Sequence, residues 1–306
     1  MQVRTHFPDL FLTNMLPLLD EVIFTEFNPM PPQFSKIFRV MKSTRSAEQT
    51  TQVAGLGLPV VIPENGPMQY DSGVPGFNKT YVHDQVGLGF RASRIMADDD
   101  KHSLIRFFGE ELGRSMREYI EIRVAAHFNN GFTTNGFDGQ PLFSTSHPLV
   151  KAGGVQSNRL AVASDLDIPA IELMLTDFRL MVDHTGKKIR VPAEKLVIPP
   201  QLEFAAAEIL AGTWRSDTSN RTVNAFRHRD RESPFTSSMV WDYLTDPDAW
   251  FICGPKERTQ LRFYWREKPG TVHDVDFDTR AIKTAMWMRY SSGWNDFYGV
   301  MGSPGA

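Results

Sequence analysis

Histidine is the residue type best suited to bind a metal ion or to move a proton near neutral pH. The sequence has eight histidines, at positions 6, 83, 102, 127, 147, 184, 228 and 273. A zinc site within one local segment needs two ligands a few residues apart, and no two of these histidines have the HxxH or HxxxH spacing. We therefore interpret each as a surface or core histidine and predict no metal site.

Two short motifs match parts of known catalytic or nucleotide sites. Ser144-Thr-Ser-His-Pro148 places hydroxyl groups beside a histidine but lacks the GxSxG turn that exposes a nucleophilic serine. Gly87-Leu-Gly-Phe-Arg-Ala92 matches GxGxxA, but a dinucleotide site needs a strand before the glycines and a helix that begins at them. These glycines fall within a β-prone segment, so we interpret them as relief of crowding in a twisted ribbon.

Two clusters of carboxylates could bind a cation. Asp98-Asp-Asp100 precedes a predicted helix, where capping and the helix dipole already explain acidic residues. Asp274, Asp276 and Asp278 would share one face of a strand, because successive side chains of a strand alternate. Their segment lacks the glycine and the glutamate that an EF-hand loop needs. We favour a solvated strand face, and a divalent ion between subunits stays open as the alternative.

Charge and composition give little reason to expect a nucleic-acid or membrane ligand. The basic run Arg227-His-Arg-Asp-Arg-Glu232 is broken by acids and offers no aromatic rings for base stacking. A net charge of −3 over 306 residues supplies no global attraction for DNA, so any DNA contact is expected to be local and weak. The single cysteine, Cys253, cannot form an internal disulfide, and no window has the length of a membrane span. We expect a soluble protein made in the cytoplasm.

The elements that position these residues begin with an arm and an extended loop. Residues 1–54 have one short amphipathic stretch, 14–27, followed by prolines that favour extended chain. Residues 55–94 have seven glycines and four prolines between short β-prone pieces, which predicts a two-stranded ribbon. An isolated two-stranded ribbon is marginal in water, so it needs a surface to lie on. We expect that surface to belong to another subunit.

The strongest helix pattern covers residues 98–128, where apolar residues recur at every fourth position from Leu104 to Phe128. A spacing of four advances about 40° per step on a helix of 3.6 residues per turn, so the apolar stripe winds around the helix. The two ends of the stripe must therefore face different neighbours. This predicts a spine shared between several elements.

Caps and apolar runs predict the remaining elements as an α/β unit and a final strand pair. A helix over residues 166–182 would begin at Asp165 or Asp167 and end at Gly186. The other predictions are a buried strand at 195–198, an alanine-rich helix that ends near residue 212, strands at 249–252 and 261–266, a strand pair within 272–288, and loops at 129–164 and 215–238.

Four segments, taken in order, carry a resemblance to a known family. They are Phe90-Arg-Ala-Ser leading into the long helix, Asn135-Gly-Phe-Asp-Gly-Gln-Pro-Leu-Phe-Ser-Thr-Ser-His-Pro148, Pro192-Ala-Glu-Lys-Leu-Val-Ile-Pro-Pro200, and Gly293-Trp-Asn-Asp-Phe-Tyr-Gly-Val300. The whole chain resembles the major capsid proteins of tailed bacteriophages with the HK97-like fold, and the second segment is similar to a loop in the branch with Mu-like head subunits.

The resemblance implies an α+β fold with an N-terminal arm, an extended β loop, a long spine helix, a peripheral domain and an α/β axial domain. The arm would be residues 1–54 and the extended loop 55–97. The spine helix and the first part of the peripheral domain would be 98–165, the axial domain 166–267, and the second part of the peripheral domain 268–306.

The resemblance also implies a function. Such subunits assemble as hexamers and pentamers into an icosahedral head that holds double-stranded DNA, so the chain is expected in the virion after assembly in the host cytoplasm. The partners would be a separate scaffolding protein, because the arm begins almost at Met1, together with a portal and a decoration protein. Some members cross-link a lysine of the extended loop, where this chain has Lys79, which we interpret as solvated.

No catalytic, cofactor-binding or metal-binding residue is predicted, and we expect no enzyme activity. Two alternatives remain open. One is an encapsulin-like compartment, which shares the fold but holds cargo enzymes. The other is an unfamiliar hydrolase or transferase that uses His147 or the aspartates near residue 276. If the ribbon serves assembly, removal of residues 57–90 is expected to leave a subunit that folds but closes no shell.

Overall fold

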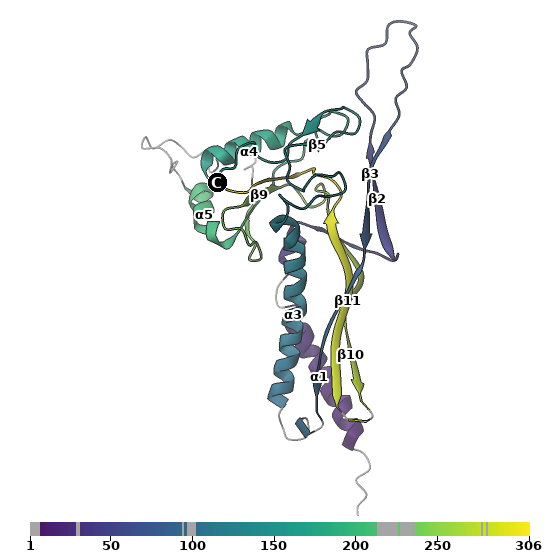
Figure 1. Ribbon diagram of the computed structural model, residues 1–306, viewed down its shortest axis with the longest axis vertical. Helices are drawn as coiled ribbons and strands as arrows, with labels where there is room; N and C mark the ends of the chain where they lie inside the picture. Colours follow the sequence, from purple (N-terminus) through teal and green to yellow (C-terminus); the bar gives the residue numbers. More distant parts are fainter. Residues whose placement is uncertain are drawn as a thin grey trace, which may run out of the picture.

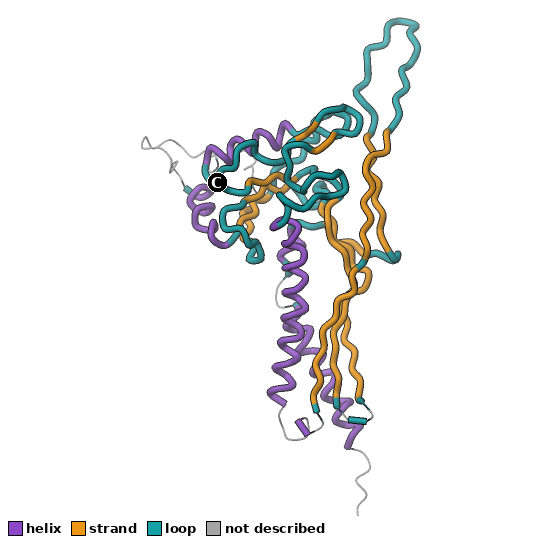
Figure 2. The backbone as a smooth tube through the Cα atoms, in the orientation of Figure 1, coloured by secondary structure: helices purple, strands orange, loops and turns teal. Residues whose placement is uncertain are grey.

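The chain folds into two bodies and one long projecting ribbon (Figure 1). A computed structural model describes residues 7–28, 31–93, 95–96, 102–212, 226, 235, 237–276, 278–279 and 281–306. In Figure 2, long strands and helices run side by side through the first body, whereas the second body has shorter elements. The ribbon leaves the molecule near the place where the two bodies meet.

The first body is built on a four-stranded sheet with the order β1-β10-β11-β4. Its strands are Arg39–Lys42 (β1), Leu261–Val275 (β10), Ile282–Trp294 (β11) and Asp84–Ala92 (β4). β1 runs parallel to β10, and the other two pairings are antiparallel. β10 and β11 are the predicted final strand pair, but they extend well beyond residues 272–288 in both directions.

Side chains of β11 alternate between the core and solvent, so one face of the sheet packs against the apolar core and the other faces solvent. Thr284, Met286 and Met288 are buried, whereas Lys283 and Trp287 lie on the exposed side. The long helices described in this body are Phe7–Phe27 (α1) and His102–Asn129 (α3), and the short helix Gln33–Lys36 (η1) lies between α1 and β1 in the chain.

α3 is the predicted spine helix. Its buried side chains are four residues apart, from Leu112 through Met116, Ile120 and Val124 to Phe128, which confirms the winding stripe over this part of the helix. Leu104 and Phe108 are the exceptions, because both are at least one-third exposed. The predicted cap at residues 98–100 lies outside the described residues.

A glycine and a glutamate join α3 to the N-terminal segment. A Cβ atom at Gly113 would lie 2.3 Å from the Ile23 carbonyl oxygen, so only glycine allows α1 to approach this closely. The buried Glu121 carboxylate accepts hydrogen bonds from the backbone N–H groups of Gln33 (2.7 Å) and Phe34 (3.2 Å). Burial raises the pKa of Glu121, and these two hydrogen bonds act against that shift.

The second body has its own sheet, ordered β12-β9-β7-β8, and its own apolar core. The strands are Val300–Ser303 (β12), Trp250–Cys253 (β9), Lys195–Ile198 (β7) and Ser237–Val240 (β8). The other elements are the helices Ile168–Leu180 (α4) and Glu203–Ala211 (α5), the short helix Pro200–Leu202 (η2), and the two-residue strands His147–Pro148 (β5) and Val155–Gln156 (β6).

The predicted start of the α4 helix is correct and its predicted end is wrong. Asp167 caps the helix, because its carboxylate accepts a hydrogen bond from the Ala170 N–H at 2.7 Å. The helix ends at Leu180, six residues before Gly186. Gly186 instead closes a separate turn at a positive φ of 83°, a conformation that glycine adopts without strain.

The ribbon does not occupy all of residues 55–94. Its paired strands are Ala47–Ala54 (β2) and Val74–Val82 (β3), and residues 55–73 form the long loop at its end. β4, which was expected in the ribbon, pairs with β11 over its whole length and so belongs to the first body. Removal of residues 57–90 is therefore expected to unfold the subunit rather than leave it folded, because that deletion removes most of an edge strand of the sheet.

Candidate assembly surface

The loop at the end of the ribbon exposes apolar side chains that nothing in the subunit covers. Figure 1 shows this loop beyond both bodies. Val61 is 97% exposed and Tyr70 91% exposed, and five more apolar side chains of the loop are also exposed: Leu56, Leu58, Val60, Ile62 and Met68. Such a concentration of exposed apolar surface marks an interaction site. We call residues 55–73 the tip.

Two lysines of the second body hold the tip at its base. The Lys151 ammonium donates to the Gly55 carbonyl (3.1 Å), the Ser72 carbonyl (2.8 Å) and the Asp71 carboxylate (2.6 Å). The Lys187 ammonium donates to the Leu56 carbonyl at 2.6 Å. Hydrogen bonds lower the pKa of Asp71 to about 2, and the bond from Lys151 has the largest effect and the bond from the Gly57 N–H the next largest. No local sequence motif predicts that these lysines contact the tip, because they lie 96 and 131 positions after Gly55 and Leu56, respectively.

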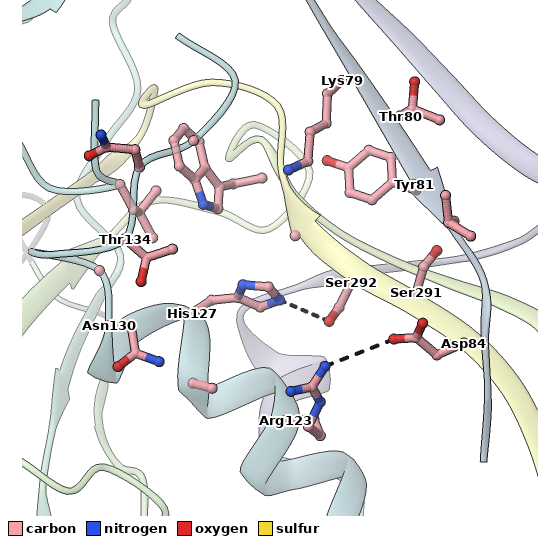
Figure 3. Close-up of a pocket in the computed structure, with 18 of the residues that line it drawn as sticks. Lys79, Thr80, Tyr81, Asp84, Arg123, His127, Asn130, Thr134, Ser291 and Ser292 are labelled. Carbon is pink, nitrogen blue, oxygen red and sulfur yellow. Dashed lines mark hydrogen bonds and ion pairs between the residues drawn. The ribbon is translucent and has the colours of Figure 1, made fainter. Parts of the chain in front are cut away.

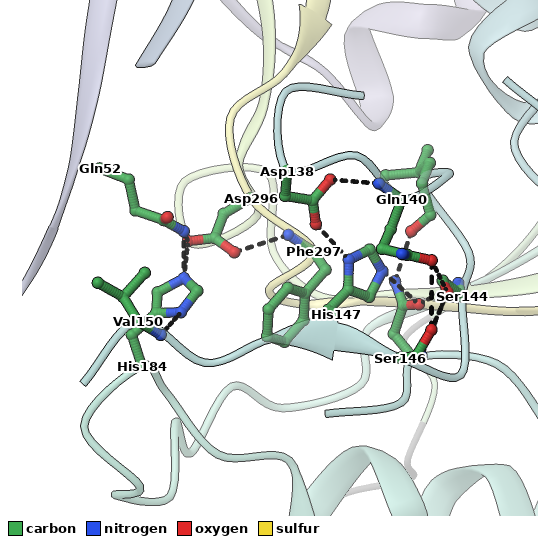
Figure 4. A network of polar contacts seen from close by, with 12 residues as sticks. Gln52, Asp138, Gln140, Ser144, Ser146, His147, Val150, His184, Asp296 and Phe297 are labelled. Atoms are coloured by element: carbon green, nitrogen blue, oxygen red, sulfur yellow. Dashed lines mark hydrogen bonds and ion pairs between the residues drawn. The ribbon is translucent and has the colours of Figure 1, made fainter. Parts of the chain in front are cut away.

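Two buried histidines, His147 and His184, lie in a network of polar contacts in the same part of the fold (Figure 4). His147 Nδ1 lies 2.6 Å from an Asp138 carboxylate oxygen and its Nε2 lies 3.1 Å from Asn158 Oδ1. Its ring stacks on Phe297 with a centroid distance of 4.6 Å. His184 Nε2 lies 3.1 Å from the Asp296 carboxylate. Both are core histidines, which is one of the two alternatives that the sequence left open.

The hydroxyl groups beside His147 are not arranged for nucleophilic catalysis. The Ser144 and Ser146 hydroxyls both donate to Gln140 Oε1, at 3.1 and 3.2 Å. Both nitrogens of His147 are taken by other oxygens, so the ring has no free nitrogen to accept a proton from a serine. The arrangement stabilises the loop that carries it.

Lys79 lies at a cavity of about 380 Å³ between β3, the end of α3 and β11 (Figure 3). Its ammonium is 5.9 Å from the centre of the Tyr81 ring, and burial lowers the pKa of Lys79. Lys79 is therefore partly buried rather than freely solvated. Deeper in the cavity, His127 Nε2 lies 2.9 Å from the Ser292 hydroxyl, and Arg123 lies 3.9 Å from Asp84.

The predicted face of three aspartates does not form. β10 ends at Val275, so Asp276 and Asp278 lie in the turn that leads to β11. The Asp276 carboxylate accepts from the Lys283 ammonium at 2.7 Å and from the backbone N–H of Asp278 at 3.1 Å. Within the described part of the chain, no group of three or more histidine, cysteine, aspartate or glutamate side chains is placed to hold a metal ion.

The glycines of the GxGxxA match lie within β4, so no helix begins at them. A Cβ atom at Gly89 would lie 2.8 Å from the Thr284 carbonyl oxygen, so glycine lets β4 and β11 approach closely. This confirms the interpretation of relieved crowding. The basic run at residues 227–232 lies outside the described residues.

The chain matches the family model described as phage capsid protein over residues 78–301, which is most of its length. It belongs to the phage capsid protein family. This confirms the family expected from the order of segments, and the protein is a phage major capsid protein. A comparison with curated proteins gives no match.

Solved structures share the fold of this capsid protein at low sequence identity. The procapsid chain of bacteriophage JBD30 is 13% identical, with 96% of this chain and 75% of that chain covered and a TM-score of 0.53. A chain of Mycobacterium phage Patience is 12% identical, with 95% and 87% covered and a TM-score of 0.55. The capsid of an empty GTA particle is 10% identical, with 89% of each chain covered and a TM-score of 0.56. The HK97-like α+β fold is thereby confirmed.

No helix in the described part of the capsid protein is long and apolar enough to cross a membrane.

We expect the capsid protein to lose stability in mild acid through His127. Burial, together with the nearby Lys79 and Arg123, lowers the pKa of His127 from 6.5 to about 4. A depressed folded-state pKa gives stability that is full above pH 6.5 and is lost as the pH falls toward 4. The loss of stability should be about 2 kcal/mol. This is less than roughly 1.4 kcal/mol per pKa unit would give for the whole shift, because the His127 side chain is only half-buried and solvent screens part of the effect.

The measurement is the free energy of unfolding in urea at several pH values between 7 and 4, for the wild type and for His127→Gln. The variant should lose less stability over this range than the wild type. Equal losses in the two proteins would show that His127 does not contribute.

Proposed function

We propose that this major capsid protein assembles as hexamers and pentamers into an icosahedral shell that encloses the double-stranded DNA of a tailed phage. The exposed apolar tip carries the proposal. Covering seven large apolar side chains gives a favourable free energy, because apolar surface removed from water contributes about 25 cal/mol per Å². The tip extends away from its own subunit, so a neighbouring subunit is the natural cover.

The further partners follow from the family and from the charge. We propose a separate scaffolding protein, a portal and a decoration protein as partners, with assembly in the host cytoplasm. A net charge of −3 supports only weak, non-specific contact with packaged DNA. We also propose that the chain belongs to the Mu-like branch, on the likeness of residues 135–148.

The two bodies support a division into peripheral and axial domains. We propose that the first body is the peripheral domain with its spine helix, and that the second body is the axial domain. β10 crosses the expected boundary at residue 267, and β12 lies in the sheet of the second body. The proposed axial domain is therefore residues 144–260 together with β12.

The proposed role is structural rather than enzymatic. It is supported by the capsid family and by the occupied nitrogens of His147. The encapsulin-like alternative is not favoured, because the chain belongs to the phage capsid protein family and the apolar tip does not distinguish the two kinds of shell. Portal and terminase genes beside this gene, and DNA rather than enzymes inside the particles, would favour the phage head.

The test is electron microscopy of the expressed protein, alone and with a scaffolding protein from the same genome. We expect large closed particles with five-fold and six-fold clusters of subunits. Small soluble species under every condition, including the presence of scaffold, would contradict the proposed function.

A further inference from the structure

We propose that Lys151 and Lys187 form a clamp that sets the direction of the ribbon in the free subunit, before any neighbour is present. The clamp comprises these two lysines and the turns that carry them, residues 149–154 and 183–187. The inference rests on the proposed function in one respect: the direction of the ribbon matters because the tip is to meet a neighbouring subunit at a defined angle.

Lys151 joins both sides of the tip to the second body. A lysine ammonium has three N–H groups, and here all three have acceptors. One acceptor, Gly55, lies where the chain leaves β2, and the others, Asp71 and Ser72, lie just before it enters β3. The last paired residues of the ribbon are Ala54 and Val74. Lys151 therefore joins the two sides of the ribbon at the point where the pairing of β2 with β3 ends.

The turns that carry the clamp are fixed to one another. The backbone N–H groups of Lys151 and Ala152 donate to the His184 carbonyl at 3.0 and 2.9 Å. The Asp183 carboxylate accepts from the backbone N–H groups of Thr185 and Lys187, both at 2.9 Å. Neither lysine is therefore on a free loop, because each turn fixes the backbone position from which the lysine side chain reaches the tip.

The ribbon also contacts the second body below the clamp. Gln52 Nε2 donates to the Asp296 carboxylate at 2.5 Å and contacts His184. A Cβ atom at Gly76 would lie 3.0 Å from a methyl carbon of Val150, so the turn packs directly against the ribbon. Both strands of the ribbon, β2 through Gln52 and β3 through Gly76, thus contact the second body. Together these contacts oppose rotation of the ribbon about its base.

The clamp depends on charge, so salt should weaken it. Hydrogen bonds from an ammonium to a carboxylate are about twice as strong as neutral ones. The Lys151 side chain is 20% exposed and the Asp71 side chain 44% exposed, so dissolved ions reach the pair. The screening length falls from about 10 Å at 0.1 M salt to about 3 Å at 1 M. High salt should therefore loosen the ribbon without unfolding the body.

The test measures the direction of the ribbon in the unassembled subunit by distances between two spin labels. The single native cysteine, Cys253, is buried, and burial raises its pKa to about 12, so it does not compete for the label. Labels go on Val61→Cys at the tip and Val162→Cys on the second body, both at exposed positions. The double variant Lys151→Met, Lys187→Met is then compared with the intact clamp.

We expect a narrow distance distribution with the clamp intact and a broad, shifted one in the double variant. Lys188→Met is the matched control, because Lys188 is exposed on the same turn and should leave the distribution unchanged. Lys151→Arg keeps the charge and the donors and should restore most of the narrow distribution. Asp71→Asn changes only an exposed residue of the tip, so it loosens the ribbon without any risk to the core.

The clamp is overturned if the double variant and Asp71→Asn both give the same distance distribution as the Lys188→Met control. The same labelled proteins are then imaged after assembly, where loosened variants should give malformed shells in place of closed ones. The two readouts separate the two claims. If the wild type never forms shells but its distribution narrows with the clamp, the proposed function fails and the clamp stands.

Discussion

A subunit in which residues 55–73 are replaced by Asn-Gly is expected to fold normally and to close no shell. Ala54 and Val74 are directly paired, so a two-residue turn can join β2 to β3. The removed side chains are mostly exposed, and the subunit loses only the contacts of Lys151 and Lys187. The melting temperature should stay within about 4 °C of the wild type, the shift that roughly 1 kcal/mol produces in a large domain.

Calorimetry checks the folding of this shortened subunit, and electron microscopy checks its assembly. A larger deletion of residues 57–90 is the contrasting control. It removes β4 from the first sheet, so it should unfold or aggregate rather than give a folded monomer. Intact shells from the shortened subunit would show that the tip is not the surface that drives assembly.

Phe128→Ala is expected to destabilise the subunit by about 3–5 kcal/mol, the range for removal of a fully buried aromatic ring. Phe128 lies at the end of α3 and contacts rings from both bodies. Its ring centre is 5.6 Å from that of Phe143, 5.3 Å from Trp241 and 5.0 Å from Phe251, and the last of these is on β9. The truncation opens a cavity where the two bodies meet.

The measurement is the free energy of unfolding in urea, with Phe107→Ala as the matched control. Phe107 is on the same helix and is 49% exposed, so its truncation should cost about 1 kcal/mol or less. If the two variants are equally stable, the ring cluster around Phe128 does not join the bodies.

Features encoded by neighbouring residues could be predicted from the sequence. The spacing of four along α3, the Asp167 cap and the strand at residues 195–198 are local patterns, and the structure confirms each. Such signals depend on side chains within a few residues, whose geometry the helix or strand itself fixes. The family, too, could be recognised from the order of segments, although the sequence is only 10–13% identical to the solved structures compared above.

Features that depend on distant residues could not be predicted. β4 is as rich in glycine as the tip, and only its partner β11, about 200 positions later, shows that it belongs to a sheet. The polar run Ala47–Ala54 carries a weak strand signal, so the ribbon was expected to begin after it. Asp276 lies beyond the end of its strand because the hairpin turn begins there. Lys151 and Lys187 are ordinary surface lysines until the fold brings the tip to them.

The order of strands in the two sheets has a consequence for synthesis of the chain on the ribosome. β10 and β11 are the central strands of the first sheet, and β12 is an edge strand of the second, yet all three are translated last. The first sheet is not complete until residue 294 has left the ribosome exit tunnel, and the second sheet is not complete until residue 303 has left it. We expect nascent chains to stay incompetent for shell formation until both sheets are complete, which delays polymerisation between subunits made on one polysome.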